Sequence, residues 1–427
     1  MANLNERVTR AVEKNFDAQL EFLENLVRRP SLRNGEGEAQ EIVALALERR
    51  GYIVDRFRTD ATKIGHHPAF SPSTVDYENS WNIVGRMQAR RPTGQSLAFN
   101  SHVDVVPAAS AHRWTKQPFE PYRQGDWLYG RGAGDMKAGL AASIFALDAI
   151  TDAGLELCGD VQIQSVVEEE ITGNGAATLF ANGCVADVVF SPEPTDEVLV
   201  RANSGVIKFR ISTRGRPAHP REPQSGRSAI ELMFHLITRL RELENQWNEE
   251  SWSHPGFRDL ANPVALTIGT INGGDWIASI PSDCSVEGRI GFYPGDDPKV
   301  RAMQFESFIE KLREDDPLLS GDDLVSLEWI ACMHPGYWLA EGSSAETCLN
   351  TMHQFVNAGA PLRSEVMACY LDAAVFAVHG GIPSLVYGPI AENIHGIDER
   401  VSLSSLLRVT KTMALFAAEW CGTRERG

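Results

Sequence analysis

Long apolar runs are missing from this sequence. The richest apolar stretch, residues 138–150, is 13 residues long and contains Asp148, whereas a helix needs about 20 apolar residues to cross a membrane. The amino-terminal residues, MANLNERVTRAVEKNF, lack the apolar segment of a signal peptide. We therefore expect no signal peptide, no membrane span and no membrane partner.

Cysteine is scarce, and positive charge is in the minority. The seven cysteines are scattered and include no Cys-x-x-Cys pair, which argues against a disulfide framework or a cysteine zinc site and favours a reducing, cytoplasmic location. The 40 Lys and Arg residues face 57 Asp and Glu residues, for a formal net charge of −17. This sign opposes binding to nucleic acid or to anionic membranes. The expected partners are small molecules, metal ions or other proteins.

The length and the order of apolar segments predict two domains. At 427 residues the chain exceeds the size at which one hydrophobic core stops growing. Short apolar runs such as NIVGRM and DVQIQSVV alternate with helical segments such as MKAGLAASIFALDAI, a pattern typical of an α/β sheet covered by helices on both faces. We expect this texture in residues 1–203 and again in residues 336–427.

Residues 204–335 have a different texture. GVIKFRISTRG and CSVEGRIGFYPG alternate like strands with one exposed face, and SAIELMFHLITRLRELENQW has the period of a long amphipathic helix. This segment reads as an α+β domain inserted into the first domain, which is then discontinuous.

Acidic and imidazole side chains follow predicted strands, where open α/β sheets place their binding crevice. SLAFNSHVDVVP delivers His102 and, two residues later, Asp104. A metal-bound imidazole usually gives its second N–H to a carboxylate, so this pair supplies both parts, or else it is an ordinary polar pair at a strand end. Three glycines lead into Asp135 and a helix follows it, so Asp135 is a ligand or a plain helix N-cap.

Three adjacent glutamates end another apolar strand. Glu168, Glu169 and Glu170 follow QIQSVV directly. Neighbouring carboxylates repel one another, so cations or protons are expected to compensate them. The alternative is a solvated acidic loop, which the apolar strand before it disfavours.

Two further candidates are Glu193 and His395. Glu193 follows an apolar strand and lies between Pro192 and Pro194, which hold its backbone extended. His395 lies in the loop VYGPIAENIHGIDERV. Two histidines with several carboxylates form a ligand set that suits zinc, and two ions fit if one carboxylate bridges them and a shared water fills the open positions.

The motifs NSHVDVVP, GRGAGDMKAG, EEEITGNGA, SPEPTD and IHGIDERV resemble, in order, those of the acetylornithine deacetylase and succinyl-diaminopimelate desuccinylase family. That family includes aminoacylases and glutamate carboxypeptidases, and the resemblance spans about residues 15–420. It implies a discontinuous zinc-binding catalytic domain of the zinc-exopeptidase type, with a mixed sheet flanked by helices. It also implies an inserted lid and dimerisation domain, and hence a homodimer.

The resemblance also assigns roles to the candidate residues. It implies that His102 and Glu193 bind one zinc ion, that Glu170 and His395 bind the other, and that Asp135 bridges them, with a cis peptide bond after it. Asp104 corresponds to the partner of His102, and Glu169 to the catalytic base. In the inserted domain, His219 corresponds to a histidine that stabilises the oxyanion in the partner subunit's site, and Arg289 to an arginine that holds the substrate carboxylate. Cobalt or manganese could replace zinc.

Three departures from the family pattern lie in segments expected near the substrate. They are Ala278, Leu371 and Ile390, which stand where the family often has Asn, Thr or Ser, and Gly. The expected reaction is hydrolysis of the amide bond of an N-acyl amino acid by metal-activated water. The alternatives are a metallo-dipeptidase or carboxypeptidase with the same chemistry, and a non-catalytic binding protein on the same scaffold. The presence of all five ligands and of Glu169 disfavours the last.

Overall fold

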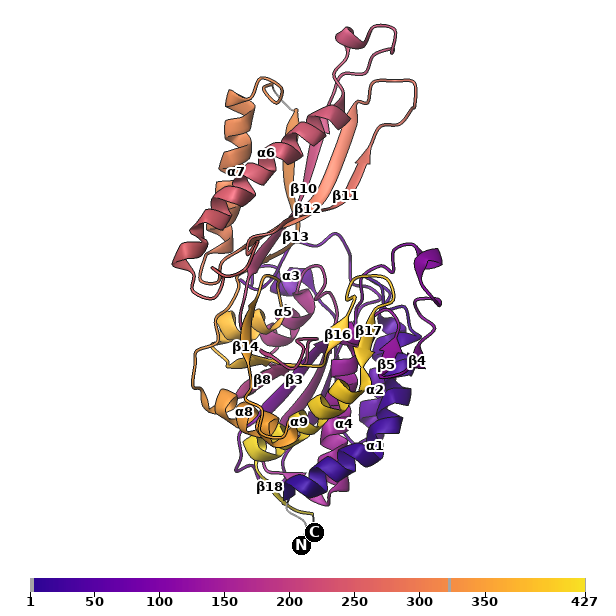
Figure 1. Cartoon of the computed structure of the whole chain (residues 1–427), viewed down its shortest axis with the longest axis vertical. Helices are drawn as coiled ribbons and strands as arrows, with labels where there is room; N and C mark the ends of the chain where they lie inside the picture. Colours follow the sequence, from indigo (N-terminus) through magenta and orange to yellow (C-terminus); the bar gives the residue numbers. More distant parts are fainter. Residues whose placement is uncertain (1–3, 322–323, 427) are drawn as a thin grey trace.

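The computed structural model describes residues 4–321 and 324–426 (Figure 1). Its larger part is built on a six-stranded mixed sheet in the order β1-β2-β7-β3-β8-β15. β7, β3, β8 and β15 run parallel, whereas β2 pairs antiparallel with both of its neighbours. The strands are β1 (Ile53–Phe57), β2 (Asn82–Met87), β3 (Leu97–His102), β7 (Val161–Val166), β8 (Val188–Ser191) and β15 (Ser384–Val386).

Helices cover both faces of this sheet, because its central strands are apolar on both sides. Every residue of β3 and of β8 is buried, and successive side chains point to opposite faces. On one face Phe99 and Phe190 join a core with α1 (Leu4–Val27), α2 (Gly37–Arg49), α4 (Ala138–Asp152), α8 (Ser344–Val356) and α9 (Leu403–Cys421). On the other, Ala98 and Val189 pack against α5 (Asn174–Ala181). The predicted α/β class with a mixed sheet is confirmed.

The smaller part stands at the opposite end of the molecule from the two chain termini (Figure 1). Its antiparallel sheet has the order β11-β12-β10-β13 and a separate core. It comprises β10 (Gly205–Arg214), β11 (Leu266–Gly273), β12 (Asp283–Phe292) and β13 (Val325–His334), with α6 (Ala229–Glu249) and α7 (Pro298–Asp315). Burial alternates along β10, as expected when helices cover one face only. We refer to this part as the lid.

Short elements complete the larger part. They are α3 (Ala61–Ile64), β4 (Tyr122–Gln124), β5 (Trp127–Tyr129), β6 (Leu155–Leu157), β9 (Leu199–Asn203), β14 (Ser364–Met367), β16 (Ala391–Glu392), β17 (Arg400–Ser402) and β18 (Thr423–Glu425). The four-stranded sheet β16-β17-β5-β4 was not expected from the sequence, since its strands are only two or three residues long. Within the described ranges, no helix is both long and apolar enough to cross a membrane.

Candidate metal centre

Three neighbouring parallel strands deliver acidic and imidazole groups to one edge of the main sheet. His102 is the last residue of β3, the run Glu168 to Glu170 follows β7, and Glu193 follows β8. Because β3 lies between β7 and β8, the carboxyl ends of the three strands meet, which is where such sheets form their binding crevice.

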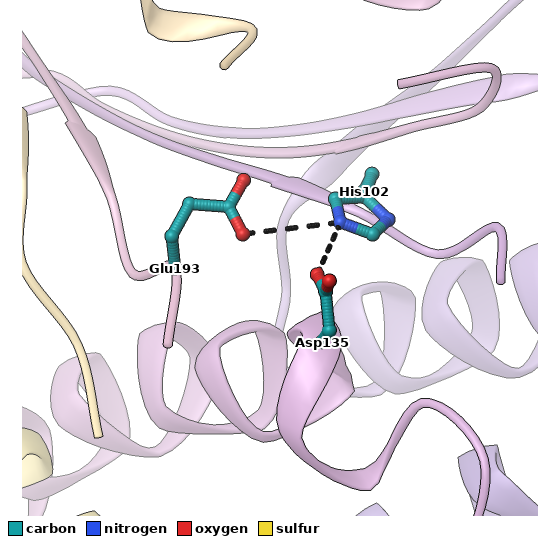
Figure 2. A group of neighbouring side chains, drawn as sticks. All are labelled: His102, Asp135 and Glu193. Atoms are coloured by element: carbon teal, nitrogen blue, oxygen red, sulfur yellow. Dashed lines mark hydrogen bonds and ion pairs between the residues drawn. The ribbon is translucent and has the colours of Figure 1, made fainter. Parts of the chain in front are cut away.

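The first group of potential ligands comprises His102, Asp135 and Glu193. His102 Nε2 lies 3.0 Å from Asp135 Oδ1 and 3.9 Å from Glu193 Oε2. Figure 2 shows both carboxylates turned toward the same imidazole nitrogen. The three ligand atoms lie within 4.8 Å of one another, so one ion can contact all of them.

The second group comprises Asp135, Glu170 and His395. His395 Nε2 lies 3.2 Å from Asp135 Oδ2 and 3.1 Å from Glu170 Oε1, and these ligand atoms also lie within 4.8 Å of one another. Asp135 is therefore shared: its Oδ1 faces His102 and its Oδ2 faces His395. The peptide bond between Asp135 and Met136 is cis, as the family resemblance implied.

His102 is held in one orientation by the backbone that follows it. Its Nδ1 lies 2.9 Å from the carbonyl oxygen of Asp104, and a carbonyl only accepts, so Nδ1 carries the proton and Nε2 is free to bind a metal. The Asp104 carboxylate is farther away, with Oδ1 at 3.6 Å, and its Oδ2 accepts the N–H of Glu170 at 3.2 Å. Asp104 thus contacts His102 mainly through its main chain, and its side chain supports the glutamate loop.

A buried ion pair supports the Asp135 turn. Glu399 Oε1 accepts the N–H groups of Gly134 at 2.9 Å and of Asp135 at 3.1 Å, and its other oxygen accepts from Arg131. Arg131 also donates to the carbonyl of Gly396, 3.0 Å away and next to His395. The pair therefore ties the Asp135 turn to the His395 loop.

Proton affinities in the cluster show that its acids are crowded. Burial, together with the neighbouring Asp135, raises the pKa of Glu193 to about 8. Hydrogen bonds to Asp135 and Glu170 raise the pKa of His395 to about 10. Burial raises the pKa of Glu169 well above its usual range, and the charges of Asp372 and Glu193 add to this rise. The cluster retains protons that bound cations would displace, so the donor set and its charge both fit metal ions.

A cavity of about 620 Å³ adjoins the cluster and is lined from both parts of the molecule. Glu169, which is 8% exposed, lines it from the larger part of the molecule together with Tyr370 and Leu371. Arg289 of β12 lines it from the lid, and its Nε has no hydrogen-bond partner among the described residues. Of the three departures, only Leu371 lines this cavity; Ala278 and Ile390 do not.

The structure does not bring His219 to this cavity. His219 is exposed in the loop between β10 and α6, and it is not among the residues that line the cavity. In a single copy of the chain, it therefore has no contact with the metal groups.

The groups that hold two buried acids of the site gave no usable signal in the sequence. Glu168 is buried and accepts hydrogen bonds from Arg33 at 2.5 Å, Thr172 at 2.9 Å and Tyr77 at 3.2 Å. Asp372 is also buried near Glu169 and accepts from the hydroxyl of Tyr370 at 3.0 Å. Arg33, Tyr77 and Tyr370 lie far from these motifs or in ordinary apolar segments, and only the fold shows their contacts.

Comparison with known proteins agrees with this geometry. Residues 98–419 match the profile of peptidase family M20/M25/M40. The N-formyl-4-amino-5-aminomethyl-2-methylpyrimidine deformylase of Bacillus subtilis is 29% identical over 93% of this chain and 92% of its own length. The succinyl-diaminopimelate desuccinylase of Xylella fastidiosa is 27% identical over 90% of this chain and 93% of its own.

Solved structures share the fold. Human carnosine dipeptidase 1 superimposes with a TM-score of 0.78 at 14% identity, over 98% of this chain and 99% of that one. A dinuclear metal-binding peptidase of the M20 family from Bacillus subtilis superimposes with a TM-score of 0.58 at 15% identity, over 96% of this chain and 99% of that one. With its family match covering most of the sequence and its acid and imidazole groups gathered at the sheet edge, the chain belongs to the M20/M25/M40 family of metal-dependent, amide-cleaving hydrolases.

Proposed function

We propose that this enzyme hydrolyses the amide bond of an N-acyl amino acid at a centre of two divalent metal ions, zinc in the first instance. The observation that carries the proposal is the position of Asp135. Each of its two carboxylate oxygens faces a different histidine, and each histidine has a glutamate of its own nearby. A carboxylate shared in this way suits a bridge between two ions.

In this proposal His102 and Glu193 would hold one ion, Glu170 and His395 would hold the other, and Asp135 would be shared between them. When bound, the ions polarise the substrate carbonyl and lower the pKa of a bound water toward roughly 7. Asp104 keeps His102 in the tautomer with a free Nε2.

Glu169 is the proposed general base. It follows the buried strand β7, lines the cavity together with Glu170, and is in neither ligand group. It removes a proton from the attacking water and then returns it to the leaving amine. Its burial keeps bulk water away from this transfer, which strengthens the electrostatic interactions of the site.

The position of Arg289 favours an amino acid as part of the substrate. Arg289 lines the cavity, and its Nη2 donates a long hydrogen bond of 3.4 Å to the carbonyl of Ala368. A planar guanidinium with free donors suits a carboxylate. The alternative acyl group is itself an amino acid, which makes the enzyme a dipeptidase or carboxypeptidase.

A second candidate comes from the deformylase relative. Its name specifies an N-formyl aminomethyl-pyrimidine, which is a substrate without a carboxylate. The similarity covers nearly all of both chains. The two candidate substrates differ in that only the amino acid has a carboxylate for Arg289 to bind. Turnover of N-acetyl and N-succinyl amino acids, of dipeptides and of the formylated pyrimidine by zinc-loaded protein decides between them. A preference for the formylated pyrimidine that Arg289→Met leaves unchanged would reject the amino-acid substrate.

We also propose a cytoplasmic homodimer in which the lid, residues 204–335, mediates dimerisation and the catalytic domain comprises residues 1–203 and 336–427. Support comes from the lid tip, where Ile277 is 99% exposed and Trp276 is 69% exposed. The loop that carries His219 is bonded to this tip, because Ile280 donates to the carbonyl of Ala218 at 3.1 Å. In the proposed dimer, His219 stabilises the oxyanion in the partner subunit's site, as the family resemblance implied. The seven free thiols suit a reducing compartment.

A further inference from the structure

Lys208 is a lid residue that contacts the loop of the catalytic base. It lies on β10, and its Nζ donates to the carbonyl oxygens of Glu170 at 2.7 Å and of Ile171 at 2.9 Å. Both acceptors lie directly after Glu169. The partners of the ammonium are thus main-chain groups of the catalytic domain, although the lysine belongs to the lid.

The loop is held from two sides. From the catalytic domain, Asp104 accepts the N–H of Glu170 at 3.2 Å, and from the lid Lys208 donates to its carbonyl. The carbonyl of Ile171 also accepts the N–H of Cys332 on β13 of the lid, at 3.1 Å. The two peptide groups that flank Glu170 are therefore fixed by different domains, and a displacement of the lid acts on the loop directly.

The positive charge of Lys208 makes its two hydrogen bonds strong and makes both acceptors necessary. Hydrogen bonds from an ammonium are stronger than neutral ones, and an ammonium removed from water is costly unless such partners satisfy it. Arg289 lies directly opposite Lys208 in the pairing of β10 with β12. A substrate carboxylate bound to Arg289 would therefore contact the same pair of strands, β10 and β12, that carries Lys208.

We propose that Lys208 is a positioning residue that couples the orientation of the lid to Glu169 and Glu170. Loss of the lysine frees the loop from the lid, and the base and one metal ligand then lose their fixed position. The inference rests on the proposed roles of Glu169 and Glu170 but makes a separate prediction about the loop itself.

The test compares three variants with the wild type. Lys208→Met keeps the length of the side chain but removes its donors, and Lys208→Arg keeps the charge and the donors. The matched control is Lys311→Met, the same substitution at an exposed lysine on α7 of the lid, which does not line the cavity. Lys208→Gln serves in place of Lys208→Met if the latter does not fold.

Three readouts are used: amide hydrogen exchange of residues 168–173, zinc affinity by competition with a chelator, and kcat and KM. In Lys208→Met, we expect the amides of Ile171, Thr172 and Gly173, which all donate to the Glu168 carbonyl, to exchange about tenfold faster. We expect zinc affinity and kcat to fall by about 10- to 100-fold, with KM nearly unchanged. Lys208→Arg should recover most of each loss, and Lys311→Met should behave as the wild type.

Two results overturn the proposal. If KM for carboxylate substrates rises while exchange and zinc affinity stay at wild-type values, Lys208 binds the substrate anion instead. If Lys208→Met matches Lys311→Met in every readout, the contact has no role. Hydrogen exchange and zinc affinity are measured without substrate. The role of Lys208 can therefore be tested even if the protein does not cleave N-acyl amino acids, and a failure of the proposed function is distinguishable from a failure of the Lys208 proposal.

Discussion

Replacing Arg131 by methionine should destabilise the catalytic domain and disturb the metal centre together. Arg131 and Glu399 are each about 1% exposed as side chains, so removal of the guanidinium leaves a buried carboxylate without its counter-charge. Breaking a buried pair in this way costs about 3–5 kcal/mol. Since about 1 kcal/mol shifts the melting temperature of a large domain by roughly 2 °C, we expect a decrease of about 6–10 °C. Because Glu399 also holds the N–H of Asp135, zinc affinity should fall as well.

Differential scanning calorimetry of the metal-free protein measures the first effect without interference from zinc. The control is Arg10→Met, which removes an exposed pair with Glu6 on α1; such helix-surface pairs contribute only about 0.3–0.5 kcal/mol. The double variant Arg131→Met, Glu399→Gln removes both charges, keeps an acceptor oxygen for the N–H groups of Gly134 and Asp135, and should recover part of the loss. If Arg131→Met melts within about 1 °C of Arg10→Met, the buried pair of Arg131 and Glu399 does not contribute the expected stability.

Three further predictions follow from the site and the lid. Glu169→Gln should lower kcat by about 10²- to 10⁴-fold while the zinc content of the protein stays at the wild-type value, and near-wild-type turnover would remove Glu169 from the role of base. Burial lowers the pKa of His334 to about 3, so on acidification the unfolded chain takes up this proton first. Between pH 7.5 and pH 5.5 the metal-free protein should therefore lose about 1.4 kcal/mol of stability through this group, and His334→Gln should show a correspondingly smaller decrease in melting temperature. Ile277→Glu should convert a dimer into a monomer in sedimentation experiments, because it places a charge on an apolar contact surface; an unchanged dimer would place the interface elsewhere.

The positions of the ligands could be anticipated because their signal is local. His102 and Glu193 each come at the end of an apolar strand, or just after one, and parallel strands bring their carboxyl ends to one edge of a sheet. The run from Glu168 to Glu170 follows a third such strand. The positions of these residues in the sequence therefore predict that their side chains meet. In the structure, His102 and Glu193 lie in one group of potential ligands, and Glu170 lies in the other.

The supporting contacts could not be anticipated, because they depend on pairs that are distant in the chain. Arg131 and Glu399 are 268 residues apart. Each lies beside a residue with a stronger signal of its own, Asp135 in one segment and His395 in the other. Lys208 occupies an ordinary polar position in an alternating strand, and only the docking of the lid shows that its ammonium reaches Glu170. The contact of His102 with the carbonyl of Asp104, in preference to the carboxylate, depends on backbone geometry beyond β3.

The metal content of the purified protein tests the central claim most directly. After zinc loading and removal of free metal, elemental analysis should give about two zinc ions per chain, one for each ligand group. His395→Ala should retain about one, because His102, Asp135 and Glu193 are left in place. A wild-type chain that binds one ion or none, or a His395→Ala protein that still binds two, would contradict a centre in which Asp135 bridges two metals.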